Sequence, residues 1–142
     1  VMGKLGRTDL GIEEYQTALK IDPTFSEAHF ILATYYNERG MTYEAIDALK
    51  KAIAYNPKHL KAHYELARAA FKVGDSPTAI KEFEFVKGKA PKFENVCYHL
   101  AEVYFADGKL KLALQEYKRY LKLSPKGEYV DEAKKMLQQY RR

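Results

Sequence analysis

The amino-acid sequence predicts an all-α solenoid of antiparallel helix pairs that stack through a shared core. Two regularities lead to this fold class. Glycines and prolines each recur at a step of 34 residues, at Gly6, Gly40, Gly74, Gly108, Pro23, Pro57, Pro91 and Pro125. Between them, apolar residues follow the spacing of helices that bury one face. A repeat of this kind is one hairpin, and it needs neighbours to cover its apolar stripe.

The first element, residues 1–23, fits only part of a repeat. Residues 1–5 match the last turns of a leading helix that Gly6 closes, and a second helix is expected from Thr8 to Ile21. Because the partner helix is then mostly absent, we expect one apolar face of the second helix to lie open. That face is a candidate for self-association.

Three full hairpins are expected next, over 26–57, 60–91 and 94–125. In the first of them, one helix begins at Ser26 and ends at Gly40, a residue suited to a helix C-terminus. The following helix opens at Thr42, which can act as a cap, and stops at Pro57. In the second hairpin, Ser76 before Pro77 marks a helix start.

The last element, residues 128–142, is one more amphipathic helix. Its apolar residues are Val130, Ala133, Leu137 and Tyr140. Repeat arrays need a terminal helix with a polar outer face, so we expect this helix to cap the array. Residues 1–142 are therefore expected to form a single domain.

The hairpin over 60–91 departs from the others near its end. It carries Lys87, Gly88 and Lys89 in a stretch where the other copies have apolar residues at the two lysine positions. Since glycine destabilises a helix interior by about 1 kcal/mol, residues 86–90 are expected to be the softest turn of the array. Phe85 is expected to pack against the next hairpin, and exposure on the outer face is the alternative.

Small residues also keep the 34-residue step. They include three alanines and three Leu-Ala pairs, at Ala45, Ala79, Ala113, Leu32-Ala33, Leu66-Ala67 and Leu100-Ala101. With these features the chain resembles the tetratricopeptide repeat (TPR) family over nearly its whole length. It departs from that family in having no tryptophan, in placing polar residues at three positions that are often large and apolar, and in one glycine where other copies have alanine. These residues are His29, His63, Cys97 and Gly11.

The resemblance implies a right-handed superhelix whose leading helices line a concave groove for a partner peptide or helix. The side chains at the repeat positions of that groove are Phe30, Thr34, Asn37, Lys61, Tyr64, Arg68, Phe71, Tyr98, Glu102 and Phe105. Aromatic rings there would offer large contact areas; the alternative is that they are buried between hairpins. A groove edged by Lys61, Arg68 and Lys72 favours an apolar or aromatic peptide with an acidic flank.

Some members of the family hold the C-terminal carboxylate of a chaperone in a clamp of lysine, asparagine and arginine. The matching positions here are Phe30, Thr34, Glu65, Asn95 and His99. Asn95 alone has a clamp residue type, and Glu65 has the wrong charge. A chaperone tail is therefore not the expected partner.

Composition narrows the possible partners. The net charge of +5 is spread along the chain, so no nucleic-acid partner is expected. No apolar run approaches the length of about 18 residues that spans a membrane, so direct membrane contact is not expected either. The compartment stays unknown, because a protein with one cysteine is compatible with the cytoplasm and the bacterial periplasm, and a targeting signal would lie upstream.

Motifs for catalysis are not found in the sequence. It has no nucleophile elbow and no glycine-rich phosphate loop, so neither an enzyme nor a cofactor is expected. His59 and His63 are four residues apart, but His59 falls in a turn, so no metal site is expected. The equivalent residues His29, His63 and Cys97 lie on successive hairpins, too far apart for one ion, and are expected to be semi-buried.

These observations predict a protein–protein interaction scaffold or adaptor. The alternative is a structural, self-associating assembly factor that uses the open N-terminal helix, such as a component of bacterial envelope or pilus assembly. Function in such arrays depends on the residues of the groove rather than on the fold, so the partner's identity stays open.

Overall fold

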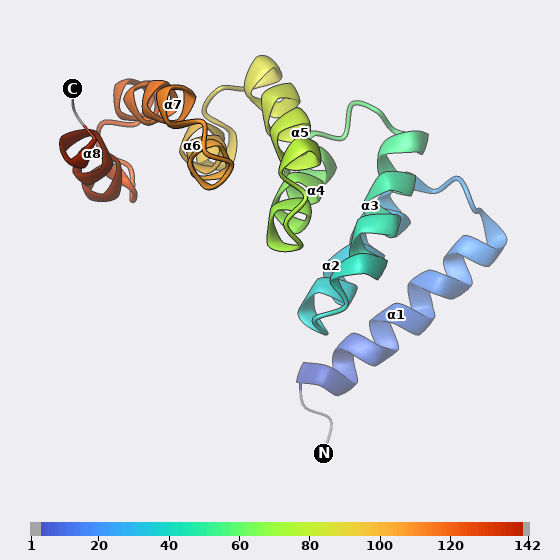
Figure 1. Ribbon diagram of the computed structural model, residues 1–142. Coiled ribbons are helices and arrows are strands. Elements are labelled where there is room, and N and C mark those ends of the chain that lie inside the picture. The colour runs from blue at the N-terminus through green and yellow to red at the C-terminus, as the bar shows by residue number, and fades with distance from the viewer. Residues whose placement is uncertain (1–3, 141–142) are drawn as a thin grey trace. The chain divides into compact units, whose positions relative to one another are not determined.

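The computed structural model describes residues 4–140, and within them it contains α-helices, one 3₁₀ helix and no strand. The helices, shown in Figure 1, are α1 (Lys4–Ile21), α2 (Ser26–Glu38), α3 (Thr42–Tyr55), α4 (Leu60–Lys72), α5 (Ser76–Lys89), the 3₁₀ helix η1 (Phe93–Asn95), α6 (Val96–Ala106), α7 (Leu110–Leu123) and α8 (Val130–Gln139). The predicted all-α class is confirmed.

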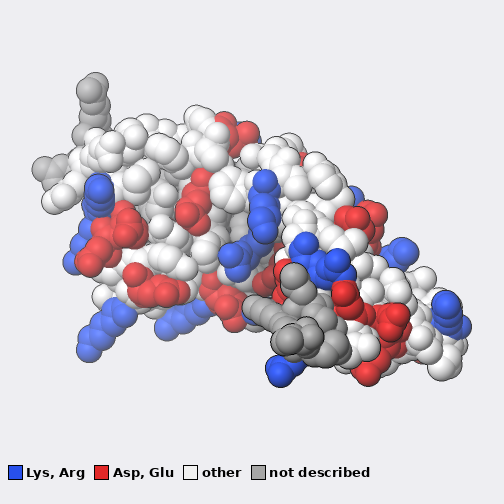
Figure 2. All heavy atoms as spheres, turned by 90° about the horizontal axis from the view of Figure 1, so that it is seen from below, with Lys and Arg blue, Asp and Glu red and all other residues white. Residues whose placement is uncertain are grey.

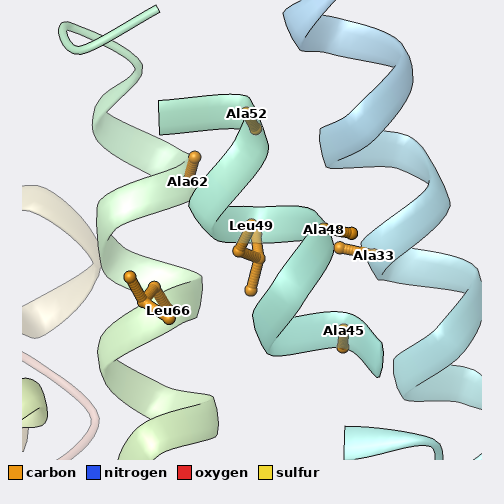
Figure 3. Close-up of a cluster of buried hydrophobic side chains, with 7 residues drawn as sticks. All are labelled: Ala33, Ala45, Ala48, Leu49, Ala52, Ala62 and Leu66. Atoms are coloured by element: carbon orange, nitrogen blue, oxygen red, sulfur yellow. The ribbon is translucent and has the colours of Figure 1, made fainter. Parts of the chain in front are cut away.

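The chain divides into two compact units, Val1–Ala69 and Ala70–Arg142. In the first unit, α2 packs against both α1 and α3. The core that joins α2, α3 and α4 is made of alanines and leucines, as Figure 3 shows, and its members are Ala33, Ala45, Ala48, Leu49, Ala52, Ala62 and Leu66. Small side chains at these positions let the helices approach closely, and their burial supplies the driving force for packing.

Helix α1 runs without a break through Gly6, so the predicted helix end at Gly6 is wrong. A single interior glycine costs only about 1 kcal/mol, and contacts with α2 offset that cost. Thr8 Oγ1 donates to Glu38 Oε2 at 3.0 Å, and Arg39 forms an ion pair with Asp9. The part of the predicted leading helix that falls on residues 1–3 lies outside the described residues.

Gly11 is explained by a close approach of α1 to α2. The Tyr35 ring occupies the place of the missing side chain, because a Cβ built on Gly11 would lie 2.5 Å from Tyr35 Cζ. At the positions equivalent to Tyr35, later hairpins carry the smaller Ala69 and Val103. A larger residue on α2 is therefore matched by a smaller one on α1.

The repeated glycines end helices as predicted. Gly40, Gly74 and Gly108 have φ values of 74°, 82° and 78°, the left-handed region that favours glycine. After each helix the chain then bonds back to the last turn; in the first case the Met41 N–H donates to Tyr36 O at 2.8 Å. This is the Schellman arrangement.

One predicted cap is wrong. Thr42 begins α3 but does not cap it, because the N-cap residue is Met41 and no side chain bonds there. The predicted start of α5 at Ser76 is confirmed, and the residue before it, Asp75, caps the helix: the Asp75 carboxylate accepts a hydrogen bond from the Thr78 N–H at 3.2 Å. Aspartate is among the preferred N-cap residues because its carboxylate accepts from a free backbone N–H of the first turn.

In the second unit, α6 packs against α5 and α7, and α8 packs against α7. Helix α5 continues through Gly88 to Lys89, and the softness expected of residues 86–90 stays a prediction. Phe85 is half-buried, with Lys89 Nζ lying 5.7 Å from its ring centre. Glu94 and Asn95 have φ values of 47° and 58°, and α6 starts only after them, at Val96.

Acidic and basic side chains are intermixed on the face shown in Figure 2. Within residues 4–140, no helix has the length and apolar character needed to cross a membrane.

Candidate interaction surfaces

In the first unit, α2 and the residue before α4 are tied together by a ring contact and a hydrogen bond. The Phe30 and His59 ring centres lie 4.6 Å apart, and His59 Nε2 lies 3.1 Å from Glu27 Oε2. Thr34 is exposed one turn further along α2, and its hydroxyl donates to the Phe30 carbonyl at 3.3 Å. We call the surface over these residues the α2/α4 face, which comprises Phe30, Thr34, Asn37, Lys61 and Arg68.

Tyr64 lies beneath the α2/α4 face rather than on it. Its side chain is 3% exposed, and two cations cover the ring: Lys61 Nζ and Arg68 Cζ lie 5.5 and 5.9 Å from its centre. The expected contact ring is therefore buried beneath a half-buried lysine and an exposed arginine. Such cation–π contacts fix the orientation of long side chains.

Tyr98 is also buried, in the second unit, with 9% of its surface exposed. The ring stacks on Tyr129 with centres 4.1 Å apart and planes 5° apart, and it meets the Tyr117 and Tyr120 rings at 5.8 and 5.5 Å. The segment that leads into α8 thus covers the predicted contact residue. Burial raises the pKa of Tyr98, and it raises the pKa of Tyr117 to about 12.

The remaining predicted residues of the second unit have varied surroundings. Phe71 is half-buried, the Glu102 carboxylate lies 3.0 Å from His99 Nδ1, and the exposed Phe105 lies 5.4 Å from the Tyr140 ring. In the whole predicted set, the exposed side chains are Thr34, Arg68 and Phe105. The half-buried ones are Phe30, Asn37, Lys61, Phe71 and Glu102, and the buried ones are Tyr64 and Tyr98.

His29, His63 and Cys97 share a role that the sequence did not reveal. His29 Nε2 and His63 Nε2 each lie 2.8 Å from the carbonyl oxygen of Pro23 and Pro57, and Cys97 Sγ lies 3.6 Å from that of Pro91. Because a carbonyl only accepts, each histidine donates through Nε2–H. All three side chains are buried, which confirms the packing role. The constant step of six residues after each proline was the available signal.

A partly buried ionic network joins α5, α6 and α7, and the sequence did not reveal it. Lys87 Nζ lies 3.0 Å from Glu116 Oε2 and 2.9 Å from Glu84 Oε1. The Tyr104 hydroxyl donates to Glu84 Oε2 at 2.5 Å. We call these four side chains the Lys87 network.

Charges in the Lys87 network have shifted pKa values. Burial alone would lower the pKa of Lys87, but hydrogen bonds to Glu84 and Glu116 outweigh it and raise the pKa. Burial alone would raise the pKa of Glu84, but hydrogen bonds from Tyr104 and Lys87 outweigh it and lower the pKa. Both shifts favour the charged forms.

Cys97 lies in this neighbourhood and is a poor nucleophile. Burial, together with the Glu116 carboxylate, raises the pKa of the thiol to about 11. Glu116 Oε1 is buried and accepts no hydrogen bond from any described residue. Since only the thiolate is reactive, this cysteine is structural at neutral pH.

A cleft of about 420 Å³ lies between α1 and α3, with α2 at its base. We call it the α1–α3 cleft. It is lined by Gln16, Leu19, Lys20, Pro23, His29, Leu32, Tyr36, Glu44, Asp47, Ala48 and Lys51. Gln16 Nε2 donates to the Tyr36 hydroxyl at 3.2 Å across its base. The sequence did not reveal this cleft, because its residues come from three helices and a turn.

Metal-ligand geometry is not found among residues 4–140, where no three His, Cys, Asp or Glu side chains converge. The His59 ring uses both of its nitrogens, since Nδ1 accepts from the Ala62 N–H at 3.2 Å and Nε2 contacts Glu27. His63 instead bonds to Pro57. In these hydrogen bonds, the two histidines therefore have different partners.

The fold and these surfaces define a helical-hairpin repeat protein. A family model described as anaphase-promoting complex, cyclosome, subunit 3 matches residues 13–86, just over half of the chain. A second model, described as tetratricopeptide repeat, matches residues 94–126. The chain belongs to the tetratricopeptide repeat family.

Solved structures show the same fold. A crystal structure of MamA protein is 25% identical, with a TM-score of 0.82, and the alignment covers 94% of this chain and 80% of that one. A MamA double mutant is 17% identical, with a TM-score of 0.87 and coverage of 99% and 88%. A thermophilic TPR protein of Thermus thermophilus is 22% identical, with a TM-score of 0.73 and coverage of 94% and 75%. The comparison with curated proteins finds no match. Proteins of this family generally act as non-catalytic scaffolds for protein–protein interaction.

Proposed function

We propose that this chain is an interaction scaffold that binds a segment of a partner protein on its α2/α4 face. One observation carries the proposal: Arg68 and Lys61 both lie over the Tyr64 ring, so two cations are held at one place on this face. Arg68 is exposed and forms no ion pair with any residue in the described range. Its guanidinium is available to a carboxylate of the partner.

Partner chemistry follows from the neighbouring side chains. Phe30 is half-buried on α2 and offers an apolar edge, and Thr34 and Asn37 offer polar groups along the same helix. An apolar or aromatic segment with an acidic flank fits this combination. In the second unit, the corresponding contact residues would be Phe71, Glu102 and Phe105.

The family match supports a scaffold role. The model that matches residues 13–86 is named for a subunit of a multiprotein complex. Membership of such an assembly requires surfaces that recognise other chains, which is the activity proposed here.

Charge reversal on the α2/α4 face tests the proposal. Partners are captured from an extract of the source cells with the native chain and identified by mass spectrometry, and their affinity is measured by surface plasmon resonance. Arg68→Glu should weaken binding about tenfold or more, because it replaces attraction of an acidic flank by repulsion. The control is Lys50→Glu, an equal charge change at an exposed position of α3. Equal affinity of the native chain and Arg68→Glu, or no captured partner, would contradict the proposal.

Self-association through α1 is the second candidate function, that of an assembly factor. It is favoured by the exposure of Leu10 and Ile21, which are 48% and 82% exposed on this helix. Sedimentation velocity over a range of concentrations should then show a rising mass that Leu10→Glu abolishes. A constant monomer mass for the native chain would exclude it.

A further inference from the structure

The two units carry the same repeat position in two different states. Residues 68 positions apart are equivalent, because this distance is two steps of the 34-residue repeat. By that rule, Leu19 of the first unit corresponds to Lys87 of the second, Ala48 corresponds to Glu116, and Gln16 corresponds to Glu84. Three lining residues of the α1–α3 cleft are thus the counterparts of three members of the Lys87 network.

In the second unit, the chain fills this position with its own ion pair. The Lys87 ammonium lies within 3.0 Å of the Glu116 carboxylate. Tyr104, the counterpart of Tyr36, closes the network by its bond to Glu84. The second unit therefore fills this repeat position with its own side chains.

In the first unit, Leu19 and Ala48 cannot form such a pair, and the place is open as the α1–α3 cleft. Its volume of about 420 Å³ is within the range of about 300 to 1,000 Å³ usual for ligand sites. Leu19, Leu32 and Ala48 give it an apolar floor. Among the described residues, the polar contact between these positions is the hydrogen bond from Gln16 to Tyr36.

Charges around the α1–α3 cleft are separated by sign. Glu44 lies in the first turn of α3 and Asp47 about one turn later, while Lys51 lies two turns after Glu44, about 10 Å along the helix. Lys20 lies near the end of α1, next to Pro23. Among residues 4–140, no ion pair involves any of these four charged side chains. One end of the cleft is therefore acidic, the other is basic, and both are unneutralised.

We propose that the α1–α3 cleft is a second binding surface, which takes an amphipathic helix of a partner protein. An apolar side chain of that helix rests on Leu19, Leu32 and Ala48. A basic side chain faces the acidic end, and an acidic side chain faces Lys20 and Lys51. Positions i, i+4 and i+7 of one helix face supply this order of basic, apolar and acidic groups at the spacing of the cleft.

A designed peptide tests the proposal on the full chain. The probe is a helical peptide of about 18 residues, with Lys, Leu and Glu at i, i+4 and i+7 in an alanine and glutamine background. Its binding is followed by two-dimensional amide NMR of the chain. Shifts should concentrate on α1 and α3, and two control peptides, one with Leu replaced by Ser and one with both charges replaced by Gln, should bind about tenfold more weakly.

Variants of the chain make the test decisive. The triple substitution Gln16→Glu, Leu19→Lys, Ala48→Glu copies the Lys87 network into the cleft and should reduce peptide affinity about tenfold or more while the circular dichroism spectrum is kept. Lys20→Glu with Lys51→Glu changes exposed charges only and should have a similar effect, so the test does not depend on folding of the triple variant. The control Lys50→Glu should bind as the native chain does.

Three results would overturn the proposal: no shift on α1 or α3 at a peptide concentration of about 1 mM, equal affinity of the native and cleft variants, or equal affinity of the three peptides. None of them bears on the α2/α4 face, which is tested with different variants and a different ligand.

Discussion

The α1–α3 cleft and the Lys87 network occupy the same place in the repeat but differ in what they bury. The first unit has leucine and alanine there, next to a core cluster of alanines and leucines. The second unit has a lysine and a glutamate, and it also buries Tyr117 and Tyr120. Both arrangements fit one backbone register. The 34-residue step therefore sets where helices lie, while individual residues decide whether a position is open or filled.

An apolar core and a buried ion pair tolerate different substitutions. A buried ion pair needs both partners, because each charge alone has lost its hydration without compensation. Contacts between alanines and leucines are not directional, but they depend on how closely the helices approach. The second unit should thus be sensitive to loss of a charge, and the first to added volume.

The largest expected effect is on the Lys87 network. Lys87→Leu should lower the free energy of unfolding by about 3 kcal/mol, because it leaves the Glu116 carboxylate, 5% exposed, without its partner. The double variant Lys87→Leu, Glu116→Ala restores the residue types of the first unit and should lie within about 1 kcal/mol of the native chain. Urea unfolding measures both. A double variant no more stable than Lys87→Leu would show that the pair is not the source of the loss.

The next largest effect on stability is expected in the first unit, where α1 and α2 approach closely. Gly11→Ala should lower the free energy of unfolding by about 2 kcal/mol, because its Cβ meets the Tyr35 ring. In a Tyr35→Ala background the same change should instead stabilise by about 1 kcal/mol through helix propensity. Thermal unfolding of the native chain, the two single variants and the double variant gives the coupling energy between the two positions. Additive effects would mean that Tyr35 does not explain the glycine.

Gly88→Ala is the matched control in the second unit. Gly88 lies inside α5, and no atom is within 4 Å of a Cβ built there. We expect a gain of about 1 kcal/mol. The result also checks the softness expected of residues 86–90: hydrogen exchange of these amides should slow in the variant.

A smaller effect is expected from pH. The folded-state pKa of Lys87 is raised above 10.5, so its contribution to stability is full below pH 10.5 and is lost as pH rises through the folded value. The pKa of Glu84 is lowered below 4.5, so its contribution is full above pH 4.5 and is lost as pH falls through the folded value. The stability difference between the native chain and Lys87→Leu, Glu116→Ala should be flat between these limits and change outside them. A difference that varied between pH 6 and 9, well inside 4.5 and 10.5, would contradict this assignment.

Cys97 gives a prediction that involves no change in stability. With a pKa of about 11 in place of 9.0, its thiolate fraction at pH 8 is about 100-fold lower than that of an ordinary thiol. Labelling with a disulfide reagent should be correspondingly slow in the folded chain and fast in urea. Rapid labelling of the folded chain would show that the side chain is accessible.

The sequence predicted the fold well because its signals are local. Gly40, Gly74 and Gly108 mark helix ends through backbone conformation, and the helix patterns between them need only neighbouring residues. Gly6 was misread because a weak local preference was outweighed by contacts of α1 with α2. A longer helix resulted.

The candidate surfaces were harder to predict because burial depends on distant residues. Tyr98 was assigned to a groove, but Tyr129 covers it from 31 positions further along the chain. The sequence places Lys87 in a turn that is expected to be soft, and it does not reveal the partner, Glu116, on another helix. In both cases the repeat register gave the position, and only the structure shows the partner.

The measurement that tests this comparison most directly is NMR of the lysine ammonium groups. The Lys87 ammonium, held by two carboxylates, should exchange its protons with water more slowly than those of Lys20 and Lys51, and it should titrate above 10.5. Exchange as fast as that of Lys20, with titration at or below 10.5, would contradict the account, because the second unit would then have no ion pair at the position where the first unit has a cleft.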